Sequence, residues 1–98
     1  MNSKIRNADT DFLFEAILQL RDIDECYRFF EDLCTVTEMK SMSQRIVVAK
    51  MLREKKVYND IVNETGASTA TISRVKRSLE YGCDAYSLVF DRIEQAEQ

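Results

Sequence analysis

Ninety-eight residues, of which 45% are apolar, suffice for one folded domain with a modest core, and a partner subunit would add to its stability. The formal net charge is −3, and no apolar run approaches the roughly 20 residues that a membrane-spanning helix needs. The first ten residues lack the apolar core of a signal peptide, so we expect a cytoplasmic protein with no membrane partner.

The residue types that most often carry catalysis or bind metals are scarce. The chain has no histidine, and its cysteines, Cys26, Cys34 and Cys83, show no CxxC spacing. We expect buried, reduced thiols rather than a disulfide framework or a zinc site, and a redox sensor is the alternative. Since we find no nucleophile–base pair, metal cluster or phosphate loop either, we expect no enzyme, no metal and no cofactor.

Turn-forming residues are also rare. There is no proline, and the only glycines are Gly66 and Gly82, whereas a β-sandwich or barrel would usually need more turn residues. Few breaks and many good helix formers predict a single all-α domain over residues 1–98, with about six helices.

The first predicted helix, residues 11–20, is apolar on nearly every side. A surface helix of a monomer would keep a polar half, so we expect burial on several sides, with a second subunit as the cover. The next helix is expected over residues 24–33, because Asp22 with Glu25 three residues later is typical of a helix start.

Thr35 and Glu38 have the spacing of a capping box and predict the start of a longer helix, which the sequence "REKK" ends. We assign residues 11–54 to dimerisation. The apolar residues of the longer helix recur at spacings of three and four: Met39, Met42, Ile46, Ala49 and Leu52.

Two short helices follow, over about residues 58–65 and 69–81, with a tight turn at Gly66 that requires a positive φ. Ser68 is a good N-cap for the second helix, and Gly82 should close it. This arrangement, over residues 57–81, predicts a helix-turn-helix. Four apolar residues would hold its helices together: Ile61, Ala67, Ile72 and Val75.

The last predicted helix covers residues 84–94, with Asp84 as its cap. We expect it to pack within the dimer. Its apolar residues fall on one face: Tyr86, Val89, Phe90 and Ile93.

Charge is distributed unevenly along the chain. Residues 1–39 carry a net −5, residues 40–81 a net +5, and residues 82–98 a net −3. The acidic total therefore does not exclude a nucleic-acid partner, since a basic segment suitable for phosphate binding lies between acidic flanks. An ordinary solvated helix face is the alternative.

The start of the helix over residues 69–81 suits the DNA major groove, because small side chains allow a close approach to base edges. The expected exposed residues are Ser68, Thr69, Ala70 and Ser73, with Arg74 and Arg77 further along. Phosphate attraction is expected from Lys55, Lys56, Lys76 and Arg77. The alternative is a protein-interaction module that uses a helix-turn-helix without binding DNA.

Residues 35–82, which include "VTEMKSMSQRIVVAKMLREKKVYNDIVNETGASTATISRVKRSLEYG", resemble the Trp repressor family and look closest to its YerC-type branch. "ETGASTATISR" is the most specific part. The resemblance implies an all-helical, intertwined homodimer that regulates transcription. It also implies DNA contacts at Tyr58, Asn59, Ser68, Thr69, Ala70, Thr71 and Ser73.

The resemblance extends to an effector pocket in which two arginines hold an indole ring. Arg74 matches one arginine, Arg45 matches the other with a one-residue gap near Lys55, and Ser78 aligns with a further pocket residue. Val75 stands where the repressor has glycine, so its side chain should fill space that the indole needs. We therefore expect a repressor of a near-palindromic operator that acts without tryptophan, or with an unidentified small-molecule effector.

Overall fold

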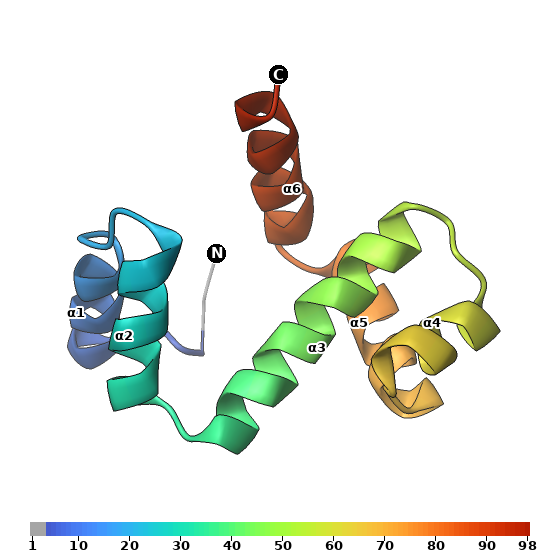
Figure 1. Ribbon diagram of the computed structural model, residues 1–98, viewed down its shortest axis with the longest axis horizontal. Coiled ribbons are helices and arrows are strands. Elements are labelled where there is room, and N and C mark those ends of the chain that lie inside the picture. The colour runs from blue at the N-terminus through green and yellow to red at the C-terminus, as the bar shows by residue number, and fades with distance from the viewer. Residues whose placement is uncertain (1–3) are drawn as a thin grey trace. The chain divides into compact units, whose positions relative to one another are not determined.

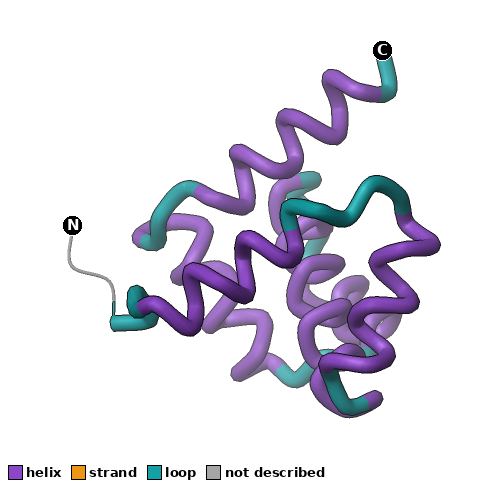
Figure 2. Tube along the Cα trace, turned by 90° about the vertical axis from the view of Figure 1, so that its left-hand side faces the viewer, coloured by secondary structure: helices purple, strands orange, loops and turns teal. Residues whose placement is uncertain are grey.

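The computed structural model describes residues 4–98, and the chain divides into two compact units on either side of the boundary between Val36 and Thr37. The described residues form six helices and no strand, which confirms the all-α prediction (Figures 1 and 2). The helices are α1 (Ala8–Ile17), α2 (Ile23–Leu33), α3 (Val36–Arg53), α4 (Tyr58–Thr65), α5 (Thr69–Tyr81) and α6 (Ala85–Ala96). None of these helices is long and apolar enough to cross a membrane.

The first unit holds α1 and α2, and each helix starts at a side-chain cap. The Asn7 side chain accepts a hydrogen bond from the Thr10 amide at 2.8 Å, so α1 begins three residues before the predicted start and ends at Ile17. Asp22 accepts from the Glu25 amide at 2.8 Å, and Glu25 accepts from the Arg21 amide at 2.9 Å. The predicted cap of α2 is therefore confirmed.

The apolar side chains of this unit lack cover within the unit itself. Between residues 4 and 36 no side chain is buried, and Phe12, Leu18 and Tyr27 are 72%, 80% and 67% exposed. The expected burial of the first helix involved a second subunit, and in the single chain α1 and α2 do not enclose their own apolar surface. A second subunit as cover stays a prediction.

The second unit contains the hydrophobic core. Its buried residues come from α3, α4, the turn after α4, α5 and α6: Val48, Ala49, Met51, Ile61, Ala67, Ile72, Val75 and Phe90. Ile61, Ala67, Ile72 and Val75 are the four residues that the sequence assigned to packing of the helix-turn-helix. The apolar stripe predicted for α3 is only partly confirmed, because Met42 and Ile46, which precede the buried Val48 and Ala49, are exposed.

The two residues predicted to bound the link between α5 and α6 are found there. Gly82 closes α5 as predicted, with φ −85°, and a Cβ there would lie 2.3 Å from the Ser78 carbonyl oxygen. Close approach to the backbone therefore requires this glycine. Asp84 does precede α6, but with φ 60° and no side-chain cap hydrogen bond, and α6 extends to Ala96.

All three cysteines are free thiols. Cys26 and Cys34 are half-buried and Cys83 is exposed, so the expected burial is wrong for Cys83 and incomplete for the other two. Cys83 lies in the short link between α5 and α6, where the core does not reach. In the part of the chain that is described, no group of three or more His, Cys, Asp or Glu side chains is arranged to hold a metal ion.

Candidate nucleic-acid interface

The turn between α4 and α5 is built around Gly66 and Thr65. Gly66 has φ +71°, and its amide donates to the Val62 carbonyl at 2.8 Å. The Thr65 hydroxyl donates to the Ile61 carbonyl at 2.6 Å and accepts from the Ala67 amide at 3.1 Å. The turn thus satisfies backbone groups that the end of α4 leaves without helical partners.

Ser68 begins α5 as predicted. Its hydroxyl accepts a hydrogen bond from the Thr71 amide at 3.1 Å and donates to the Thr71 hydroxyl, also at 3.1 Å. These two hydroxyls therefore shape the start of the helix. Thr69, Ala70 and Ser73 are exposed beside them, which leaves a tip of small side chains at the N-terminus of α5.

Helix α5 has one buried face and one exposed face. Ile72 and Val75 are buried and hold the helix in the core, while Arg74, Lys76 and Arg77 are exposed. Because one face is fixed by packing, the opposite face is presented to solvent in a defined orientation.

Tyr58 and Lys76 are brought together across the two short helices. The Lys76 ammonium lies 5.9 Å from the centre of the Tyr58 ring and 4.0 Å from a carboxylate oxygen of Glu80. Tyr58 is half-buried and Asn59 is exposed at the start of α4. The Lys76 ammonium therefore lies between the Tyr58 ring of α4 and the Glu80 carboxylate of its own helix.

Gln44 links α3 to the turn, and the sequence pattern did not indicate it. Its side-chain amide donates to the Thr65 carbonyl oxygen at 3.1 Å, over 21 residues of sequence. Gln44 lies between Ser43 and Arg45 in the sequence, and a polar residue in such a setting is usually just solvated, so no pattern singled it out.

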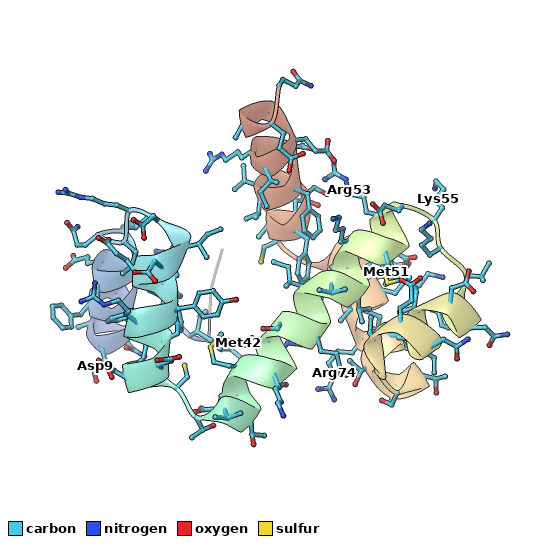
Figure 3. All side chains as sticks on the ribbon, in the orientation of Figure 1. Asp9, Met42, Met51, Arg53, Lys55 and Arg74 are labelled. Atoms are coloured by element: carbon cyan, nitrogen blue, oxygen red, sulfur yellow. The ribbon has the colours of Figure 1, made fainter. Side chains whose placement is uncertain are left out.

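The three residues of the expected effector pocket have local partners. Arg45 donates to the Ser41 hydroxyl of its own helix at 2.9 Å, and the Ser78 hydroxyl donates to the Arg74 carbonyl at 3.3 Å. Arg74 projects from α5, on the opposite side of α3 from Arg53 in the view of Figure 3. Val75 is only 2% exposed, so its side chain belongs to the core as predicted.

Arg53 stabilises a different part of the unit, between α3 and α6. Its guanidinium forms ion pairs with Asp91 and Glu94, donates to the Ser87 carbonyl at 3.3 Å, and lies 5.7 Å from the centre of the Phe90 ring. The hydrogen bond to Asp91 raises the pKa of Arg53 above its usual value, so this side chain stays charged.

Comparison with known proteins agrees with this arrangement. The family model described as Trp repressor protein matches residues 8–94. YerC of Bacillus subtilis (strain 168), itself uncharacterised, is 57% identical over 94 residues, which are 96% of this chain and 90% of YerC.

Two solved structures share the fold. A candidate Trp repressor from Staphylococcus aureus is 57% identical, with a TM-score of 0.89 over 93% of this chain and 91% of the other. A TrpR-like protein from Eubacterium eligens ATCC 27750 is 58% identical, with a TM-score of 0.91 over 95% and 96%. Six helices, the helix-turn-helix and these matches over nearly the whole length lead to one conclusion: the chain belongs to the Trp repressor family.

Proposed function

We propose that the protein is a transcription regulator of the cytoplasm that binds double-stranded DNA, with α5 as its recognition helix. The Trp repressor family consists of helix-turn-helix DNA-binding regulators and not of enzymes. The observation that carries the proposal is the exposed tip of Thr69, Ala70 and Ser73 on a helix whose opposite face is fixed by Ile72 and Val75. Small side chains at a fixed helix end suit direct contact with base edges.

The active form in this proposal is a homodimer that acts as a repressor. The support is the apolar surface of α1 and α2, which the single chain leaves exposed. Two recognition helices would enter successive major grooves about 34 Å apart, so the operator should be a near-palindrome.

We further propose that tryptophan is not the effector. The buried Val75 occupies the position at which the repressor has glycine, and Arg45 bonds to its own helix. In this proposal the protein responds either to an unidentified small-molecule effector or to no effector. Calorimetric titration of the protein with tryptophan should show no binding, and a dissociation constant in the micromolar range would refute this part of the proposal.

The experiment that tests DNA binding compares Arg77→Ala with Thr69→Ala on duplexes selected from a random library. Arg77 is exposed and is proposed to contact phosphate, so Arg77→Ala should weaken binding to every sequence. With two copies in a dimer, the slope of log affinity against log salt should fall in size by about 1.8. Thr69→Ala should instead change the base preference, by roughly 1–3 kcal/mol at one position in each half-site.

Arg92→Ala is the matched control for charge, because Arg92 is an exposed arginine on α6, outside the helix-turn-helix. It should leave the salt slope unchanged. An Arg77→Ala effect confined to one operator position would refute its phosphate role. If the unaltered protein shifts no DNA in a gel-shift assay even at low salt, the protein-interaction alternative is favoured.

A further inference from the structure

We infer that Gln44 is a positioning residue that holds the recognition helix at the angle needed to read bases. This inference rests on the proposed DNA-binding function. It starts from the hydrogen bond between the Gln44 side-chain amide and the Thr65 carbonyl, which joins α3 to the turn of the helix-turn-helix at 3.1 Å.

Gln44 extends from a rigid support. It precedes the fully buried Val48 by four residues, one helical turn, and Val48, Ala49 and Met51 anchor this part of α3 in the core. Both Gln44 and Thr65 are half-buried, so water competes less with their hydrogen bond than it would at an open surface. The hydrogen bond therefore fixes the turn relative to α3.

Thr65 passes this constraint on to α5. While its carbonyl is held by Gln44, its hydroxyl bonds to both the Ile61 carbonyl and the Ala67 amide. Ala67 is itself buried, and Ser68, the cap of α5, follows directly. One side chain of α3 thus fixes the last residue of α4, the turn and the start of α5 together.

Base reading and phosphate attraction depend differently on this geometry. Hydrogen bonds to base edges require placement to about 0.5 Å, whereas attraction of exposed lysine and arginine side chains to phosphate tolerates small rotations. Loss of the Gln44 bond should therefore weaken binding to a selected duplex and leave binding to a scrambled duplex unchanged. A purely structural role would lower stability without changing this ratio.

The test variant is Gln44→Met, which keeps the side-chain length and neutral charge but removes the amide. Gln44→Ala is a second variant in case methionine does not fit. Gln95→Met is the matched control, because Gln95 is exposed near the end of α6, outside the helix-turn-helix and beyond the residues assigned to the dimer. The hydrogen bond lost in each protomer corresponds to roughly a 3- to 10-fold loss of affinity for each half-site of the selected duplex.

Hydrogen exchange of the free protein supplies an independent readout. The amides of Gly66 and Ala67 are bonded within the turn, so both should exchange faster in Gln44→Met, while amides of α6 should not. The inference is supported if Gln44→Met binds the selected duplex more weakly, binds the scrambled duplex as well as the unaltered protein does, and exchanges the Gly66 and Ala67 amides faster. Equal losses on both duplexes, or no loss on either, overturn it.

Failure of the proposed function is separable from this result. If the unaltered protein does not distinguish the selected from the scrambled duplex, the DNA-reading proposal fails, and with it the role of Gln44 in reading. If the unaltered protein does distinguish them while Gln44→Met binds like Gln95→Met, only the role of Gln44 is refuted.

Discussion

Alanine should cost more stability at Gly82 than at Gly66, although only Gly66 has a left-handed backbone. Gly66 has φ +71°, yet no heavy atom lies within 4 Å of the place a Cβ would occupy. The cost of Gly66→Ala is therefore the left-handed backbone alone, about 1–2 kcal/mol, less the 0.4–1 kcal/mol that alanine saves by restricting the unfolded chain. The net loss should be at most about 1.5 kcal/mol.

Gly82 has an unremarkable φ of −85°, but its Cβ would lie 2.3 Å from the Ser78 carbonyl oxygen. That oxygen is backbone and cannot rotate away, so the end of α5 must shift. The shift costs roughly 1–3 kcal/mol, and loss of the bond from the Gly82 amide to Ser78, 2.9 Å in length, adds about 1 kcal/mol. Gly82→Ala should therefore lose about 2–4 kcal/mol.

Urea unfolding followed by circular dichroism measures both free energies of unfolding. All variants must be compared at one protomer concentration, because the stability of a dimer depends on it. The unaltered chain is the reference, and equal m-values would show that the unfolded states are comparable. A larger loss for Gly66→Ala than for Gly82→Ala would contradict the reasoning.

Three other substitutions should change stability in defined directions. Ile72→Ala empties a fully buried site and should cost about 3 kcal/mol in urea unfolding, against about 1 kcal/mol for Ile72→Val; equal losses would argue against tight packing there. Lys55→Gly should stabilise the protein by about 0.5–1 kcal/mol, because Lys55 has φ 63° at the end of α3; a loss of stability would show that its side chain makes a compensating contact. Arg53→Gln breaks the ion pairs with Asp91 and Glu94 and should lower the melting temperature at low salt but less so at high salt, and a salt-independent difference would argue against an electrostatic cause.

Local chemistry explains which elements could be predicted from the sequence. The bounds of α4 and α5 were predicted correctly because Gly66 and Ser68 determine the turn and the cap through their own backbone and side chains. The start of α1 was missed because Asn7, a cap residue, precedes the apolar run that marked the helix. Apolar periodicity locates a helix, but its first residue depends on the cap.

Features that depend on three-dimensional contacts rather than on a local sequence pattern could not be predicted. The bond from Gln44 to Thr65 links residues 21 positions apart, and no local pattern specifies it. The close approach at Gly82 depends on the path of the last turn of α5, which composition does not reveal. The exposure of Met42 and Ile46 likewise shows which part of an apolar helix the core of this chain uses.

The same residues bear on how such a regulator would be controlled. A pocket that switches a helix-turn-helix must hold the recognition helix in one position only when the ligand is bound. Here Val75 is packed in the core, Arg45 bonds to Ser41, and Gln44 ties the turn to α3 through a direct hydrogen bond. A ligand can shift an equilibrium only by its differential affinity for two states, and a recognition helix that the chain's own contacts hold in place leaves little for a ligand to change. Under the proposed function, DNA occupancy would then follow the concentration of the protein, through dimer formation and mass action, rather than the level of an amino acid.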